Sequence, residues 1–138
     1  EWIQKIHRDR AVRGYSAETA TAMILRRMPD YVHYICPQFS RTDINFQRVP
    51  TIDTSNPFTI DKIPPSEQSM IVIHIANPDK INPDYPRLLD TLEGSFMSQA
   101  DTLVVPAGNM VSAMELLLNP VIEHMMKRRD RSVKQSAA

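Results

Sequence analysis

The stretch "SMIVIHIA", residues 69–76, decides the fold, because its β-branched and apolar side chains predict a buried strand. A second segment, "DINFQRVPTI" at residues 43–52, alternates apolar and polar side chains and predicts another strand, with Pro50 indicating a sheet edge or a bend. A third, "DTLVVP" at residues 101–106, predicts a short buried strand. These segments lie far apart in the sequence, so a sheet must be assembled across long connections.

Helical patterns surround these strands. Residues 1–12 suit a short helix that ends at Gly14, and Ser16 is a suitable N-cap for the next one. That second helix is expected to be kinked or restarted at Pro29 and to end at Pro37. Residues 87–93 and 109–129 predict two further helices, whereas residues 53–67 and 77–86 predict loops. Helices and strands mixed in this way indicate an α/β or α+β fold.

The composition excludes several classes of protein. The chain has 138 residues, of which 42% are hydrophobic, and its 16 basic and 16 acidic residues balance. This balance argues against general binding of nucleic acid. No apolar run is long enough to span a membrane, and Cys36 is the only cysteine, so no internal disulfide can form. We therefore expect a cytoplasmic protein.

Two further observations concern what the sequence lacks. Only 3 glycines occur, and no segment matches the glycine-rich motifs that bind nucleotide phosphates. The sequence starts at Glu1 and enters a helical pattern without an N-cap. We therefore expect a truncated or processed polypeptide whose N-terminal part is missing.

The segment "KIHRDRAVRG", residues 5–14, is the strongest candidate for a functional site. On a helix, Lys5, Arg8 and Arg13 share a face with Asp9, whereas Arg10 points elsewhere. Such a run can be a solvated surface held by ion pairs between neighbouring turns. One carboxylate cannot neutralise three cations, however, and a phosphate ligand would relieve their repulsion. Asp9 is then open to three roles: hydrogen-bonding orienter, metal ligand through water, or base.

Other candidates carry weaker signals. Arg26 and Arg27 are either surface arginines or a second basic site, and the polar, aromatic segment at residues 38–58 is either a structural or a ligand-binding loop. Within that segment, Asp53 and Ser55 can cap backbone groups in a turn. His33 and Cys36 are three residues apart, but this spacing is more typical of packing than of a zinc site.

Three blocks of the sequence resemble a known family: "EWIQKIHRDRAVRGYS", "VHYICPQFSRTDINFQRVPTIDTSNPF" and "GSFMSQADTLVVPAGNMVSAMELLLNPVI". Together they look like the C-terminal half of phosphoribulokinases of the bacterial type, over residues 1–126. The remaining residues, 127–138, are expected to be a polar tail. The resemblance implies part of a P-loop, nucleotide-kinase-like mixed-sheet fold that the absent half completes.

The resemblance also implies an activity. It implies transfer of the γ-phosphate of ATP, with Mg²⁺, to O1 of ribulose 5-phosphate, giving ribulose 1,5-bisphosphate for carbon fixation, by a homo-oligomer that is typically an octamer. Lys5 and Arg8 then act on the ATP phosphates, Asp9 is catalytic and is a candidate for contact with the metal, and Arg13 supports binding of the sugar phosphate. Arg27 matches an arginine linked to nucleotide or effector binding.

The sequence departs from the family at the positions that align with two arginines involved in activation by NADH, where it has His74 and Gln99. Activation by NADH is therefore in doubt. Two other functions stay open: a related kinase with another acceptor, of the uridine or pantothenate kinase type, and a non-catalytic binding or oligomerisation module. The isolated chain is expected to be inactive.

Overall fold

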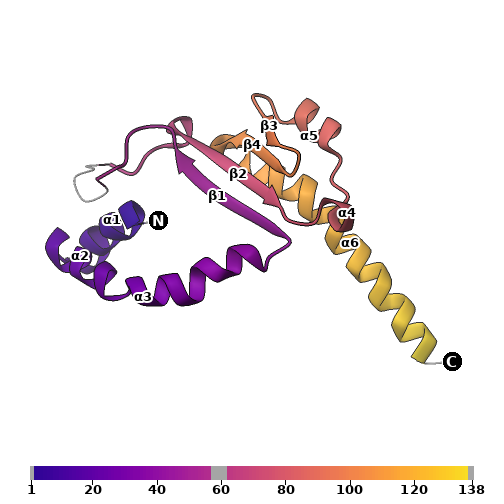
Figure 1. The fold of residues 1–138 in the computed structure, drawn as a ribbon, viewed down its shortest axis with the longest axis horizontal. Coiled ribbons are helices and arrows are strands. Elements are labelled where there is room, and N and C mark those ends of the chain that lie inside the picture. Colours follow the sequence, from indigo (N-terminus) through magenta and orange to yellow (C-terminus); the bar gives the residue numbers. More distant parts are fainter. Residues whose placement is uncertain (1, 57–61, 137–138) are drawn as a thin grey trace.

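The computed structural model describes residues 2–56 and 62–136, with side chains described up to Val133. Helical segments precede the first strand, connect some of the strands and follow the last one (Figure 1). In chain order they are α1 (Trp2–Arg13), α2 (Ala17–Arg26), α3 (Met28–Asp30), a π-helical turn (Tyr31–Ile35), a 3-10 segment (Cys36–Ser40), β1 (Ile44–Pro50), a 3-10 turn (Ser66–Gln68), β2 (Ser69–Ile75), α4 (Pro78–Ile81), α5 (Tyr85–Thr91), β3 (Phe96–Gln99), β4 (Thr102–Pro106), a 3-10 turn (Ala107–Asn109) and α6 (Met110–Ser136).

The four strands of the described residues form one antiparallel sheet in the order β1-β2-β4-β3. The three strands expected from the sequence are confirmed as β1, β2 and β4. Ile73 in the middle of β2 lies opposite Phe46 of β1 and opposite Leu103 of β4. Pro50 ends β1 at an edge of this sheet, where a missing backbone donor costs no ladder bond.

The main hydrophobic core lies where the sheet meets α5 and α6. Every second residue of β2 is buried, which follows from the period of two along a strand. The buried core comprises Ile71, Ile73, Ile75, Leu88, Leu92, Leu103, Val105, Ala113 and Leu117. The sequence therefore predicted the central strand correctly, together with its burial.

The first two helices form a smaller core of their own. Ile6 of α1 packs with Ala20 and Ile24 of α2. Gly14 takes the left-handed conformation, with φ of 68°, and ends α1. The Ser16 side chain accepts a hydrogen bond from the backbone N–H of Thr19 at 3.2 Å. Both predicted helix boundaries are confirmed.

The expectation that Pro37 ends the second helix is wrong. The helix is interrupted near Pro29, as expected, and restarts as α3. Helical backbone then continues through Pro37 to Ser40, because this proline occupies the first turn of a 3-10 segment, where its missing N–H is not needed.

The expectation of an uninterrupted loop at residues 77–86 is also wrong. Pro78 begins the short helix α4, and Asn82 stops it in the left-handed conformation, with φ of 51°. Asp84 then caps α5 by accepting a hydrogen bond from the N–H of Arg87 at 3.1 Å. Prolines in the first turn of a helix are compatible with it, so their number does not indicate a loop.

Near the C-terminal end, the sequence missed one strand and predicted one helix too short. Strand β3 was missed because only Met97 among its four residues is even half-buried, so no alternating pattern marks it. The predicted helix at 109–129 is confirmed as α6 but continues to Ser136, because its charged residues favour helix even without a buried face. In Figure 1 the end of α6 projects away from the sheet. No helix in the described part of the chain is long and apolar enough to span a membrane.

Candidate active site

The cationic segment lies on α1 and surrounds a buried carboxylate. Asp9 is completely buried, and its Oδ2 atom lies 2.6 Å from Nζ of Lys5. Its Oδ1 atom lies 3.3 Å from Nη1 of Arg13 and 3.4 Å from Nε of Arg8. The backbone carbonyl of Asp9 accepts a hydrogen bond from the N–H of Tyr15 just after the helix. The predicted grouping of these four side chains is therefore present.

The surroundings of Asp9 determine its charge. The hydrogen bond from Lys5, aided by the nearby arginines, lowers the pKa of Asp9 below its usual range, although burial acts in the opposite direction. The carboxylate is therefore ionised near neutral pH. A low pKa makes it a poor base, and both of its oxygens are already engaged by cations, so it is a poor fit for direct binding of Mg²⁺. The orienting role fits this geometry best.

The cluster keeps cationic groups available to a ligand. Asp9 compensates one of three positive charges, and the side chains of Arg8 and Arg13 are 57% and 50% exposed. Arg10 is exposed and makes no ion pair with Asp9, as expected from its place on the helix. An arginine with one nitrogen anchored on a buried carboxylate presents its others in a fixed orientation, which suits recognition of phosphate oxygens.

Arg27 of the second basic pair lies near Lys5 of the cationic cluster. Both line a cavity of about 280 Å³ between α1, α2 and the segment that follows. The remaining lining is mostly apolar: Trp2, Met23, Ile24, Met28, Asp30, Tyr31, Tyr34 and Ile35. The structure thus connects the predicted nucleotide or effector arginine to the cationic cluster through one cavity.

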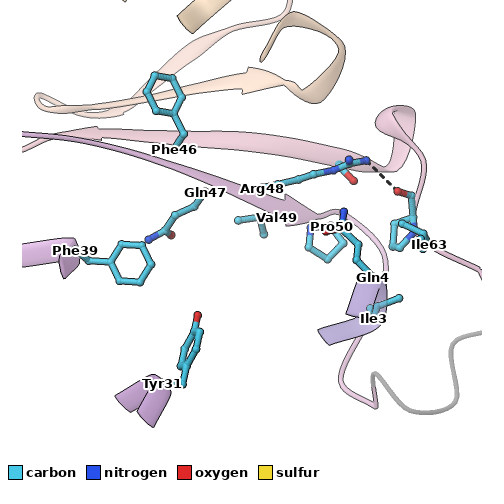
Figure 2. Close-up of a pocket in the computed structure, with 12 residues that line it drawn as sticks. Ile3, Gln4, Tyr31, Phe39, Phe46, Gln47, Arg48, Val49, Pro50 and Ile63 are labelled. Atoms are coloured by element: carbon cyan, nitrogen blue, oxygen red, sulfur yellow. Dashed lines mark hydrogen bonds between the residues drawn. The ribbon is translucent and has the colours of Figure 1, made fainter. Parts of the chain in front are cut away.

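A larger cavity, of about 490 Å³, lies between the start of α1 and β1 (Figure 2). Ile3 and Gln4 of α1 line one side, and Gln47, Arg48 and Val49 of β1 line another. Figure 2 shows Gln47 pointing toward Phe39 while Phe46 points to the opposite side of the strand. The polar, aromatic segment at residues 38–58 thus contributes to a cavity wall, a use that the sequence left open.

Two residues that shape this cavity were not singled out from the sequence. Arg48 donates from Nη2 to the carbonyl of Pro64 at 3.0 Å and so fixes the edge of the cavity. Asn45 is buried and donates to the carbonyl of Phe39 at 2.9 Å, which holds that aromatic residue against β1. The sequence carried no signal for Asn45, because the alternation along this strand places it with the polar Gln47 rather than with Ile44 and Phe46.

The remaining sequence candidates have local structural partners. Asp53 accepts a hydrogen bond from the N–H of Ser55 at 2.9 Å, which confirms its capping role, while the end of the predicted turn at Pro57 lies outside the described residues. Nδ1 of His33 forms a hydrogen bond with the backbone carbonyl of Pro29 at 2.8 Å, and Cys36 is an exposed free thiol. Across residues 2–56 and 62–136, no group of three or more histidine, cysteine or acidic residues is arranged to hold a metal ion.

The two positions that the resemblance links to effector arginines lie on strands either side of β4. His74 of β2 and Gln99 of β3 both lie opposite Thr102 of β4, one on each side. Nε2 of His74 lies 3.3 Å from Oδ2 of Asp101. We expect a histidine that already faces a carboxylate, together with an uncharged glutamine across β4, to bind an anionic effector more weakly than two arginines would.

Comparison with known proteins identifies similar chains. Residues 1–55 match the model of the phosphoribulokinase / uridine kinase family. The chain is 57% identical over 131 residues to the phosphoribulokinase of Sinorhizobium medicae and 58% identical over 132 residues to the chromosomal enzyme of Cupriavidus necator. Among solved structures, phosphoribulokinase from Rhodobacter spheroides matches 91% of this chain with a TM-score of 0.82 and 54% identity.

The matches cover nearly all of this chain but less than half of each matched protein. They cover 95% and 96% of this chain but only 45% and 44% of the two curated relatives, and 44% of the solved structure. The chain therefore spans somewhat less than half the length of the proteins it matches. The resemblance expected from the sequence is confirmed: over nearly its whole length, this chain is similar to bacterial phosphoribulokinases, of the phosphoribulokinase / uridine kinase family.

Proposed function

We propose that this chain is part of a phosphoribulokinase. The complete protein would transfer the γ-phosphate of ATP to O1 of ribulose 5-phosphate and so produce ribulose 1,5-bisphosphate for carbon fixation. The observation that carries the proposal is the buried Asp9 ringed by Lys5, Arg8 and Arg13, with both arginines still half-exposed. Transfer of a phosphoryl group depends mainly on positioning and on cations that neutralise the charge of the transition state.

In this proposal each residue of the cluster has a separate task. Lys5 and Arg8 bind the phosphates of ATP and stabilise the charge that spreads over the transferred group. Arg13 binds the phosphate of the sugar substrate. Asp9 contacts neither substrate and acts as a positioning residue that holds the three cations. Arg27, on the cavity shared with Lys5, is assigned to the nucleotide or to an effector.

Other parts of the reaction must come from residues outside this sequence. The 138 residues contain no glycine-rich phosphate-binding loop, and Asp9 is a poor fit for Mg²⁺. We therefore assign Mg²⁺ to the phosphates of ATP and to ligands that these residues do not supply. The isolated 138-residue chain is expected to be inactive for the same reason. The complete enzyme is proposed to act in the cytoplasm as a homo-oligomer, with eight copies as the expected number.

A second function, a kinase that phosphorylates uridine, is favoured by the family model alone, since its description includes uridine kinases. The deciding experiment measures ADP release by the complete protein from ATP and Mg²⁺ with ribulose 5-phosphate or uridine. Turnover with ribulose 5-phosphate alone supports the proposal, and turnover with uridine alone replaces it. Absence of turnover with both acceptors, in a folded protein, would leave a non-catalytic module as the function.

A further inference from the structure

The outer face of α6 carries an exposed apolar stripe. Of the described residues of α6, only Ala113 and Leu117 are buried, and both lie on the side that meets the sheet. On the opposite side Val111 is 67% exposed, Ile122 50% and Val133 61%. Contiguous exposed apolar surface on a soluble protein often marks an interaction site, so this face of the helix requires an explanation.

The stripe follows one line along the helix. Seven residues lie within about 40° of that line at 100° per residue, and they cover about 33 Å at 1.5 Å per residue. These residues are Val111, Glu115, Leu118, Ile122, Met126, Arg129 and Val133. Their spacings are four, three, four, four, three and four residues, so the stripe stays on one face.

The stripe has the same pattern when it is read backwards. Val111 and Val133 each lie eleven residues from Ile122, Glu115 and Arg129 each lie seven, and Leu118 and Met126 each lie four. In two copies of α6 packed antiparallel about Ile122, valine therefore meets valine and leucine meets methionine. Glu115 of each copy meets Arg129 of the other.

We infer that this stripe is a self-association surface on which α6 pairs antiparallel with α6 of a second copy of the protein, about a two-fold axis at Ile122. A two-fold axis requires a surface that is complementary to itself, and no other kind of partner imposes that symmetry. In a parallel pair Glu115 would face Glu115 and Arg129 would face Arg129, which is unfavourable. The charges therefore select the antiparallel arrangement.

The local ion pair of Arg129 does not compete strongly with this contact. Its Nη2 atom lies 3.0 Å from Oδ1 of Asp130, but both side chains are more than half exposed. Exposed pairs of this kind contribute little to stability, so Arg129 can exchange its neighbour for Glu115 of the second copy. The inference specifies a surface for the homo-oligomer proposed above, and it does not depend on which acceptor the enzyme uses.

The first test uses a cross-link across the axis. In the complete protein with Cys36→Ser, the Ile122→Cys variant should couple to a second copy with a short bis-maleimide. The matched control is His124→Cys, which is exposed on the other side of the same helix. We expect coupling at position 122 to exceed that at 124 at least tenfold in dilute protein. Equal coupling at positions 122 and 124 would overturn the inference.

The second test reverses charges and leaves the apolar residues intact. Glu115→Arg alone and Arg129→Glu alone should each weaken self-association about tenfold at low salt, because each places like charges opposite one another. The double variant should restore it, as measured by sedimentation, with circular dichroism showing that all variants fold. If the double variant associates no better than the single ones, the antiparallel register is wrong. Both tests measure self-association and not ADP release. A negative result would therefore contradict the helix pairing without contradicting the proposed kinase function.

Discussion

At the scale of single residues, the central feature is a carboxylate that serves as an anchor rather than as a reactant. Asp9 is buried, has a lowered pKa and uses both oxygens to hold cations. Its arrangement explains why a single acid occurs among four basic residues. Without it, Lys5, Arg8 and Arg13 would repel one another on the same face of α1.

Replacement of Arg8 should separate function from stability. Arg8→Ala removes a half-exposed cation, so we expect turnover of the complete enzyme to fall about 100-fold or more, with little change in melting temperature. The matched control is Arg10→Ala, which removes an exposed arginine of the same helix outside the cluster and should leave turnover nearly unchanged. Equal turnover in both variants would contradict the role of Arg8.

The charge of Asp9 should appear in the pH dependence of stability. The folded pKa is lowered, so ionised Asp9 stabilises the fold fully above its unfolded value of about 3.9 and loses this effect as pH falls through the folded value. Asp9→Asn should therefore unfold more easily than the wild type at pH 6, and the difference should shrink as the pH falls below about 4 and through the lowered pKa of folded Asp9. Denaturant titrations at several pH values measure it, and a constant difference would contradict the assignment.

At the scale of elements, α1 is positioned by a small core that is separate from the main one. Ile6, Ala20 and Ile24 hold α1 on α2, and this contact places the cationic cluster beside the cavity that Arg27 also lines. The arrangement of the site therefore depends on few apolar contacts. Loosening them should disturb function even though no cationic residue is changed.

Truncation of Ile24 tests this dependence. Ile24→Ala removes a side chain that is 5% exposed, and we expect a loss of about 2–4 kcal/mol in unfolding free energy, with a fall in turnover as α1 shifts. Leu25→Ala, next to it but 56% exposed, should change both quantities much less. Thermal unfolding and ADP release report the two effects. Unchanged stability in the Ile24 variant would mean that α1 is held by contacts other than these.

At the scale of the whole molecule, the effector positions lie in the sheet, away from the α1–α2 pair. His74 and Gln99 lie on either side of Thr102, so one strand separates them. The resemblance to phosphoribulokinases implies that relatives activated by NADH have arginines at these two positions. This sequence has histidine and glutamine there, so neither position carries an arginine.

We therefore expect NADH to leave turnover of the complete enzyme within about twofold of its basal value, since two charge-assisted contacts to the ligand are absent. Assays of ADP release with and without NADH measure it, and the double variant His74→Arg, Gln99→Arg provides the comparison. Strong activation of the unaltered enzyme would show that the effector binds through other residues.

Features that depend on local pattern could be predicted from the amino-acid sequence. Period-two burial in residues 69–76, the turn at Gly14, the cap at Ser16 and the shared helical face of Lys5, Arg8, Asp9 and Arg13 all follow from spacing along the chain. The same motifs pointed to the family. Prolines led to wrong expectations where the first turn of a helix could accommodate them, as at Pro37 and Pro78.

Features that depend on contacts between distant segments became visible in the three-dimensional fold. It showed that Asp9 is fully buried, that Lys5 and Arg27 share a cavity, and that Asn45 and Arg48 fix the wall of another. It also added β3, which has too little burial to leave a pattern. The physical reason is that burial and electrostatic environment are set by whichever side chains the fold brings together, and one-dimensional spacing does not contain that information.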